Sequence, residues 1–374
     1  MFQQLCWLVA RSAVALAVLT SLGAGPVLAQ ASHDARAPGA SGHDPFVDPL
    51  DEAAVMRRDV NARPLMSLVE AGSRYVAVGM RGLIAYSDDA GKTWQQAPSP
   101  VRSDLLALSF PSPQDGWAVG HDGVILHTAD GGRSWTKQFD GRMAATALAG
   151  YYSQRIAAGE PSLKPYLDQV ALDYKAGPSL PLLSVCFTDT RHGIAVGPFG
   201  TAVATSDGGQ TWIPVQERID NPQFLHLDAV RQIGARVYLA GEQGRVYRQD
   251  AATGRFQAVD TGYAGSFFGI AGHDGLLFAY GLKGTIYRSA DQGATWQKLP
   301  SPLHGAVTDA TYVAARHAFA FVTAAGEATL YDPATGTFTR LTPARPGVFT
   351  GIHALAGNAF LTSGLGGIGH ASLP

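Results

Sequence analysis

Short apolar runs of four to six residues, separated by turn residues, recur through most of the chain. One set consists of LLALSF from Leu105, GWAVG from Gly116, VILHTA from Val124 and SWTKQF from Ser134. Runs of this length, bounded by Gly, Pro and Asp, are typical of β-strands rather than helices. The four runs predict one antiparallel sheet with the first run innermost and the last outermost. A second set with the same layout spans residues 182–215.

Paired glycines mark the period of this pattern. The turn between the second and third runs of each set carries two glycines three residues apart, and the turns recur every 40 to 44 residues except for one interval of 77. A repeat of about 40 residues built from four short strands is typical of a β-propeller blade. We therefore predict an all-β protein, a seven-bladed β-propeller. The turns are Gly79/Gly82, Gly120/Gly123, Gly197/Gly200, Gly241/Gly244, Gly281/Gly284 and Gly364/Gly367, with a decayed copy at Thr323/Gly326.

A second motif, Ser/Thr-x-Asp-x-Gly-x-Thr/Ser-Trp, follows four of the glycine turns, and shortened copies end at Phe256 and Phe338. We interpret it as a structural Asp box (BNR repeat) between third and outer strands. There the carboxylate accepts backbone N–H bonds, the glycine provides conformational freedom, and the indole packs between sheets. Four scattered copies do not favour a calcium or catalytic role. The residues are Asp89, Gly91 and Trp94; Asp130, Gly132 and Trp135; Asp207, Gly209 and Trp212; and Asp291, Gly293 and Trp296.

The last repeat stops after its third strand. The stretch AAVMRRDV, Ala53–Val60, lies directly before the first inner strand. We predict that it pairs with the C-terminal blade as the missing fourth strand and so closes the ring, which removes an exposed sheet edge. The predicted domain is 51–374.

The N-terminus has the pattern of a secretory signal. Residues 1–29 contain a weakly basic start, an apolar run and small residues before a cleavage site predicted after Ala29. A membrane anchor is the alternative, but Gly23, Gly25 and Pro26 interrupt the run before it reaches the roughly 20 residues that span a bilayer. Residues 30–50 are expected to be a flexible linker. The prediction is a periplasmic or secreted protein without a stable membrane span after cleavage.

The long interval contains an insertion at about residues 139–181, between blades 2 and 3. GRMAATALAGYYSQRIAA is an alanine-rich helix candidate. A second predicted helix has Ser162 as N-cap and ends before Gly177. The helical pair either lies over a propeller face, where it shields the channel or binds a partner, or is a packed decoration. The apolar stripe of the second helix consists of Leu163, Leu167, Val170, Ala171 and Tyr174.

Composition argues against some classes of partner and chemistry. The chain has 28 Lys and Arg against 30 Asp and Glu, a balance that argues against nucleic acid as a partner. Cys186 is the one cysteine left after signal cleavage, so no internal disulfide is expected; a buried thiol is favoured over a reactive nucleophile, because no histidine partner is identifiable. We expect no metal and no cofactor.

The glycine turns and the connections from outer to inner strands emerge on one face of a propeller, and the Asp boxes on the other. The turn tips mix charged and apolar residues, which suits a protein interface better than a small-molecule pocket. The predicted contact residues are Arg81, His121, Asp122, Phe199, Glu242 and Lys283 at the tips, with Arg142, Tyr151, Tyr152, Arg155, Lys164 and Tyr166 in the insertion.

The segment GWAVGHDGVILHTADGGRSW, from Gly116 to Trp135, resembles the photosystem II stability/assembly factor-like propellers, and the likeness extends from about Met66 to the C-terminus. The resemblance implies a seven-bladed assembly factor that binds membrane-protein precursors through an arginine-rich face. Arg81 is the turn-tip residue to compare with this arginine-rich face. The other tips carry Asp122, Phe199 and Glu242, which depart from an arginine-rich pattern.

Asp boxes also occur in sialidases and other glycosidases, so a glycoside hydrolase acting on extracellular glycans is the alternative. The first repeat lacks the Arg-Ile-Pro motif of sialidases, and Arg155-Ile156-Ala157 is a near match outside a first-blade strand. A glycosidase needs two carboxyl groups about 5 to 9.5 Å apart, and no signature pairs acids such as Glu70, Asp122 and Glu242. We therefore predict a non-enzymatic binding platform or assembly factor for a membrane or envelope protein complex.

Overall fold

The computed structural model describes residues 47–373. The chain divides into a unit of residues 1–48 and a unit Pro49–Pro374, and only the second is described below. The predicted signal and nearly all of the predicted linker lie outside the described residues. At the end of that linker, Leu50 is buried and the Pro49 carbonyl accepts a hydrogen bond from the Arg102 N–H. The packed chain therefore begins before residue 51.

The described residues of this unit form seven four-stranded antiparallel sheets. In sheets 1 to 6 the strands follow chain order from innermost to outermost. Sheet 1 contains β1 (Leu65–Ala71), β2 (Arg74–Gly79), β3 (Ile84–Ser87) and β4 (Gln95–Ala97); sheet 2 contains β5 (Leu105–Ser109), β6 (Gly116–Gly120), β7 (Ile125–Thr128) and β8 (Thr136–Phe139). Sheet 3 contains β9 (Ser184–Phe187), β10 (Gly193–Val196), β11 (Ala202–Thr205) and β12 (Ile213–Pro214); sheet 4 contains β13 (Leu227–Ile233), β14 (Arg236–Gly241), β15 (Arg245–Gln249) and β16 (Phe256–Asp260).

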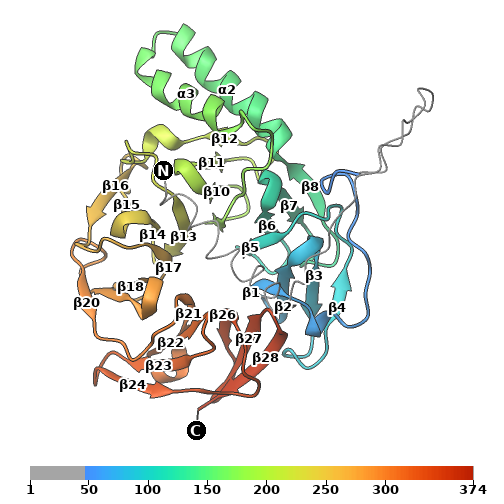
Figure 1. The fold of residues 1–374 in the computed structure, drawn as a ribbon, viewed down its shortest axis with the longest axis vertical. Helices are drawn as coiled ribbons and strands as arrows, with labels where there is room; N and C mark the ends of the chain where they lie inside the picture. The colour runs from blue at the N-terminus through green and yellow to red at the C-terminus, as the bar shows by residue number, and fades with distance from the viewer. Residues whose placement is uncertain (1–46, 374) are drawn as a thin grey trace, which may run out of the picture. The chain divides into compact units, whose positions relative to one another are not determined.

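The remaining three sheets keep the same size. Sheet 5 contains β17 (Phe267–His273), β18 (Leu276–Gly281), β19 (Ile286–Ser289) and β20 (Gln297–Leu299); sheet 6 contains β21 (Val307–Val313), β22 (Ala318–Thr323), β23 (Ala328–Asp332) and β24 (Thr337–Arg340). Sheet 7 contains, from inside to outside, β26 (Phe349–Ala354), β27 (Ala359–Gly364), β28 (Gly367–Ser372) and β25 (Thr342–Pro343). Figure 1 shows the sheets succeeding one another around a common centre.

Hydrophobic clusters lie between successive sheets, and one of them joins sheet 7 to sheet 1. The innermost strands contact each other in the same order, and β26 also contacts β1. The aromatic residue that ends each Asp box packs against the preceding sheet: Trp135 joins the cluster of sheets 1 and 2, and Trp94 the cluster of sheets 7 and 1. Each sheet thus buries both faces against its neighbours, which explains why β2, β6 and β22 are buried along their whole length.

The end of the chain differs from the prediction. The outer strand of sheet 7 is β25, in which Thr342 and Pro343 pair with Ser372 and Ala371. Residues 53–60 form no strand, so the prediction that they complete the last sheet is wrong. Only Ala54 and Val60 of these eight residues are buried, a pattern that gives a strand no apolar face.

Residues 53–60 run instead beside sheet 1. The Ala54 N–H donates to the Ser99 carbonyl, and the Gln96 side chain bonds the backbone of Val55 and Arg57. The next turn, η1 (Val60–Ala62), contacts β28 of sheet 7. The N-terminal segment therefore touches the last sheet through a short 3-10 turn rather than through strand pairing.

Two helices connect sheets 2 and 3: α2 (Gly141–Ala157) and α3 (Lys164–Asp173), with the 3-10 turn η4 (Pro161–Leu163) between them. Asp140 caps α2 by accepting hydrogen bonds from the Arg142 and Met143 N–H groups. Ser162 lies in η4 and does not cap α3, because the turn continues directly into the helix and puts Leu163 at the N-cap position.

Most of the apolar stripe of α3 packs against the protein's own core. Leu163 and Val170 are buried in the cluster of sheets 2 and 3, Leu167 and Tyr174 pack against it, and Ala171 is exposed. The pair lies at the outer margin of the ring, and α2 contacts β12 (Figure 1). It covers the outer edge of sheet 3 and does not shield the centre, contrary to one of the two predicted roles. No helix within residues 47–373 has the length and apolar character needed to cross a bilayer.

Candidate functional site

Five glycine turns have one backbone conformation. They are 3-10 turns between the second and third strands of sheets 1 to 5: η2 (Met80–Gly82), η3 (His121–Gly123), η5 (Pro198–Gly200), η7 (Glu242–Gly244) and η8 (Leu282–Gly284). We call the surface that these turns form the glycine-turn face. Gly79 shows why the first glycine is needed, since a Cβ there would lie 2.1 Å from the Pro64 carbonyl oxygen. The turns are therefore held tightly against the start of the inner strand.

The central residue of each turn has a positive φ although none is glycine. These apex residues are Arg81 (φ 57°), Asp122 (58°), Phe199 (54°), Gln243 (53°) and Lys283 (55°). The left-handed region disfavours residues with a Cβ, and glycine adopts it at least cost. One strained backbone position thus presents five different side chains.

Four of the predicted tip residues mainly stabilise their own turns. Asp122 accepts a hydrogen bond from the Ser103 hydroxyl at 2.6 Å, and Glu242 accepts one from the His226 N–H at 2.8 Å. The Phe199 ring lies edge-on to the His226 ring at 4.8 Å. His121 is partly buried, and its N–H donates to the Asp104 carbonyl.

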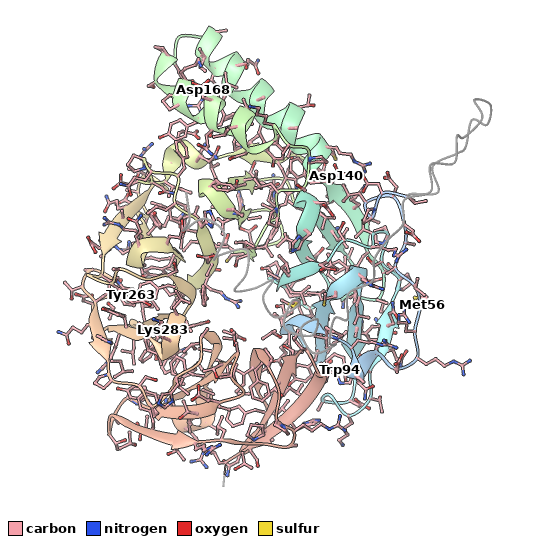
Figure 2. The ribbon with its side chains drawn as sticks, in the orientation of Figure 1. Met56, Trp94, Asp140, Asp168, Tyr263 and Lys283 are labelled. Atoms are coloured by element: carbon pink, nitrogen blue, oxygen red, sulfur yellow. The ribbon has the colours of Figure 1, made fainter. Side chains whose placement is uncertain are left out.

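Arg81 and Lys283 are the exposed cations among the predicted tip residues. Within residues 47–373 neither side chain has an ion pair or hydrogen bond; only the backbone N–H of Arg81 is engaged, by Asp104 Oδ1 at 2.7 Å. Figure 2 labels Lys283 beside sheet 5. These two side chains are therefore available to an external partner.

The predicted contact residues of the insertion are largely engaged inside the molecule. Tyr152 is fully buried, and its hydroxyl donates to Glu217 Oε2 at 2.8 Å. Burial and the Glu217 carboxylate both raise the pKa of Tyr152. Arg155 donates to Glu217 at 2.6 Å and to Glu160 at 2.5 Å, and its guanidinium lies over the Tyr151 ring. This Glu217 cluster ties α2 to the segment after β12.

Other charges fix the base of the helical pair. Arg142 pairs with Asp51 at 2.7 Å and with Asp140 at 3.0 Å. Burial of Asp140 opposes its ionisation, but hydrogen bonds from Arg142 and Lys137 outweigh burial and lower its pKa to about 2. Figure 2 shows Asp140 at the base of the pair and Asp168 on α3.

The two remaining predicted contact residues lie on α3. Lys164 pairs with Asp168 one turn along the helix. Tyr166 is half-buried, stacks on Tyr152 with ring centroids 5.9 Å apart, and meets the Phe224 ring edge-on. The structure thus places the tip residues on turns of different sheets. Arg142 lies at the base of the helical pair after β8, and the other insertion residues lie further along the two helices, so that the predicted contacts do not form one pocket.

The acids weighed for hydrolysis lie at opposite ends of the strands. Glu70 is near the β1–β2 turn, where its carboxylate lies 3.0 Å from His353 Nε2. Asp122 and Glu242 lie on the glycine turns. Arg155-Ile156-Ala157 is the last turn of α2 rather than part of a strand. Glu70 is therefore separated along the strands from Asp122 and Glu242, which lie on the turns of two different sheets.

The four Asp boxes repeat one set of hydrogen bonds. In the first, Asp89 accepts from the Thr93 N–H at 2.8 Å and from the Thr93 hydroxyl at 2.6 Å, while Ser87 accepts from the Gly91 N–H. Hydrogen bonds from Thr93 lower the pKa of Asp89 to about 2. The Trp94 indole donates to the Gly91 carbonyl. All of these donors and acceptors lie within the turn.

The third box is an exception. Trp212 is buried, yet its Nε1 has no hydrogen-bond partner within the described residues, whereas the other three indoles each donate to a glycine carbonyl. Gln138 of sheet 2 approaches this box, donating to the Gly208 carbonyl and accepting from the Trp117 indole. The carboxylate and hydroxyl hydrogen bonds of this box are otherwise the same as in the other three.

No group of three or more metal-ligating side chains occurs within residues 47–373. Cys186 is buried, and burial raises the pKa of its thiol. Sequence reasoning missed Asp51, Asp140 and Glu217. Asp140 had a readable signal, because an aspartate directly before an alanine-rich helix is a typical N-cap; Glu217 had none.

Residues 64–147 match a family model described as photosynthesis system II assembly factor YCF48. The chain is similar to photosystem II assembly lipoprotein Ycf48 of Synechococcus sp. (strain CC9902), with 24% identity over 263 residues that cover 65% of this chain and 77% of the relative. It is also similar to the chloroplastic photosystem II stability/assembly factor HCF136 of Cyanidioschyzon merolae (strain NIES-3377 / 10D), with 34% identity over 82 residues, 20% of this chain and 19% of the relative.

Solved structures show the same fold. YCF48 bound to D1 peptide has a TM-score of 0.59 at 16% identity, with 86% of this chain and 96% of that chain covered. The WD40 β-propeller domain of Doa1 has a TM-score of 0.57 at 10% identity, with 87% and 96% covered. At such identities these matches establish the propeller fold and not a shared function.

Proposed function

The chain is a relative of the photosystem II assembly factor-like propellers, and from this premise we propose that it is a non-enzymatic, protein-binding assembly factor. Its partner is a membrane or envelope protein, which it meets in the periplasm or outside the cell. Two relatives are named assembly factors, one of these a lipoprotein, and a similar structure contains a bound peptide. The signal-like pattern of residues 1–29 supports the location.

The architecture proposed for this function is a closed seven-bladed propeller in which each four-stranded sheet is one blade and the helical pair is inserted between blades 2 and 3. The hydrophobic cluster between sheets 7 and 1 supports closure, as does the hydrogen bond from the Thr350 hydroxyl to the Leu65 carbonyl. A closed ring fixes the positions of the turns relative to each other, which a multi-point protein interface requires.

The observation that carries the proposal is the set of apex residues. Glycine would fit each positive-φ position at lower conformational cost, and yet the chain keeps side chains there. Strained positions that carry exposed charge or aromatic surface are typical of interaction sites. Arg81 and Lys283 are the proposed principal contacts, and Phe199, the other tip residues and Tyr166 are proposed as further contact residues.

The proposal excludes hydrolysis as the main activity. The separation of Glu70 from Asp122 and Glu242 along the strands supports this. Assays with sialoside and aryl-glycoside substrates provide the test. Turnover that is abolished by changing one of these three carboxylates would contradict the proposal.

Site-specific photo-crosslinking in intact envelopes tests the binding face. A photoreactive residue at position 81 or 283 is expected to form adducts with a membrane or envelope protein, identified by mass spectrometry. The matched controls are positions 92 and 133, exposed Lys and Arg on Asp-box turns at the other ends of the strands. Equal adduct yields from positions 81 and 283 and from the control positions 92 and 133 would contradict the proposed face. So would the absence of adducts from positions 81 and 283.

A further inference from the structure

The junction between sheets 3 and 4 contains a cavity of about 520 Å³. Its apolar wall comes from both sheets, with Cys186, Ile194 and Ala204 on one side and Val237 and Phe256 on the other. Its polar lining comes from turns at the ends of the strands away from the glycine turns, and includes Thr188, His192, Ser206, Thr211 and Gln249. Arg218 also lines the cavity and comes from the turn η6 (Gln216–Arg218) in the connection from β12 to β13. No residue of the five 3-10 glycine turns is part of the lining.

The sequence explains why this junction is open. Where most box-bearing sheets have an indole, sheet 4 has Phe256. The cluster between sheets 3 and 4 contains only two aromatic residues, Tyr247 and Phe256, and its other members are mainly Val, Ile, Leu and Ala. The outer strand β12 is also only two residues long. By contrast, the cluster between sheets 5 and 6 contains or contacts seven aromatic residues: Phe278, Tyr280, Tyr312, Phe319, Phe321, Tyr331 and Phe338.

Among the side chains that line the cavity, Arg218 is the only one with a permanent charge. Arg218 and His192 are the charged or titratable side chains of its lining besides the Cys186 thiol, and no carboxylate lines it. Arg218 is exposed and has no ion pair within the described residues, whereas His192 lies 2.9 Å from Asp189. Arg231, on the neighbouring strand β13, is close enough to Cys186 for its charge to counteract the rise in the thiol's pKa that burial causes. The rim thus attracts an anionic group.

We propose that this cavity binds a small amphipathic anion, with its apolar body between sheets 3 and 4 and its anionic group at Arg218. The volume lies within the roughly 300 to 1,000 Å³ of small-molecule sites, and an apolar wall with a few polar groups at the mouth is their usual composition. This site is independent of the proposed partner-binding function.

Two fluorescent probes of similar shape test the proposal on the full chain. The anionic 1-anilinonaphthalene-8-sulfonate (ANS) is expected to bind saturably, with one molecule per chain. N-phenyl-1-naphthylamine (NPN), which lacks the sulfonate, is expected to bind more weakly. Absence of saturable ANS binding, or equal affinity for the two probes, would overturn the proposal.

Two substitutions separate the apolar wall from the charged rim. Ala204→Phe fills the cavity and is expected to abolish binding of both probes, whereas Ala171→Phe, on the exposed side of α3, leaves it unchanged. Arg218→Gln is expected to weaken the affinity for ANS about fivefold at low salt and to leave the affinity for NPN unchanged, because only ANS has an anionic group that can pair with Arg218. An equal effect of Arg218→Gln on both probes would contradict the placement of the anion.

A measurement on the unsubstituted protein covers the case in which Ala204→Phe does not fold. Cys186 lines the cavity, so a small thiol reagent, methyl methanethiosulfonate, should reach it through the mouth. Saturating ANS is expected to slow modification of Cys186 at least about fivefold, measured on the peptide containing residue 186 by mass spectrometry. An unchanged rate would place the ANS elsewhere and contradict the proposed site.

Discussion

At the scale of single residues, one carboxylate per Asp box organises a whole turn. Asp130 accepts from the Ser134 N–H and hydroxyl and from the Arg133 N–H, and Thr128 bonds both Asp130 and Gly132. The buried Trp135 depends on this turn for its position, because its indole donates to the Gly132 carbonyl. The aspartate is therefore a structural residue in the same sense as a helix N-cap.

We predict that Asp130→Ala lowers the free energy of unfolding by about 1 to 2 kcal/mol, the usual effect of losing a side-chain cap. Asp168→Ala is the matched control. It removes an exposed carboxylate whose partner is Lys164, and such pairs contribute about 0.3 to 0.5 kcal/mol. Denaturant unfolding measures both changes. Equal effects of the two substitutions would contradict the structural role of the box.

The box carboxylates also predict an acid sensitivity. Hydrogen bonds from Thr211 hold the pKa of Asp207 at about 2, below the ordinary value of 3.8, and Asp291 has the same shift through Thr295. A lowered pKa in the folded state stabilises it above pH 4, and this contribution is lost as the pH falls from about 4 to 2.

The substitution Asp207→Asn isolates this contribution. The difference in unfolding free energy between the wild type and Asp207→Asn is expected to be constant from pH 7 to 5 and to shrink between pH 4 and 2. Denaturant unfolding at a series of pH values measures it. A difference that does not change below pH 4 would show that Asp207 does not gain stability from its ionised form.

At the scale of elements, the Glu217 cluster attaches the helical pair to sheet 3. Tyr152→Phe removes the hydroxyl that bonds the buried Glu217 carboxylate, and we expect a loss of about 1 to 3 kcal/mol. Tyr151→Phe is the control, since the Tyr151 hydroxyl accepts only a 3.4 Å contact from Arg155 and is expected to contribute less than about 0.5 kcal/mol. Hydrogen exchange of α2 should increase in the first variant and not in the second.

Strand positions could be predicted from the sequence because each repeat contains turn motifs at fixed positions. Paired glycines fix the turn after the second strand, and the Asp box fixes the turn before the outer one. The bounds of β6 were therefore predicted, and those of β7 and β8 to within two residues. Helix α2 was also readable from its alanine content. The start of α3 was not, because Ser162 resembles an N-cap while the chain continues from η4 into the helix.

The outer strand of sheet 7 could not be read from local chemistry. β25 has two residues and no alternating pattern, and it follows directly after β24. Leu341, between β24 and β25 in the chain, is fully buried in the cluster of sheets 6 and 7, and this packing is not readable from the local sequence. The contact residues were predictable only in part, since Glu217, the partner that Tyr152 and Arg155 share, is more than 60 residues away from both in the sequence.

At the scale of the whole molecule, the last sheet holds the two ends of the folded chain together. Leu341→Ala leaves a cavity beneath the strand that completes sheet 7, and we expect it to lower the free energy of unfolding by about 2 to 5 kcal/mol. The exposed Leu172 provides the control, and Leu172→Ala should change stability by less than about 0.5 kcal/mol. A small effect of Leu341→Ala would contradict the importance of this packing of sheet 7 on sheet 6.

The central claim is that the glycine-turn face binds a membrane or envelope protein. Its most direct test is quantitative co-purification from crosslinked envelopes with wild type, with Arg81→Gly/Lys283→Gly and with Lys92→Ala/Arg133→Ala. The glycine substitutions relieve positive-φ strain, so the first double variant should remain at least as stable as the wild type. Recovery of the membrane or envelope partner should fall at least about fivefold in that variant and not in the second. Equal recovery in all three proteins would contradict the account.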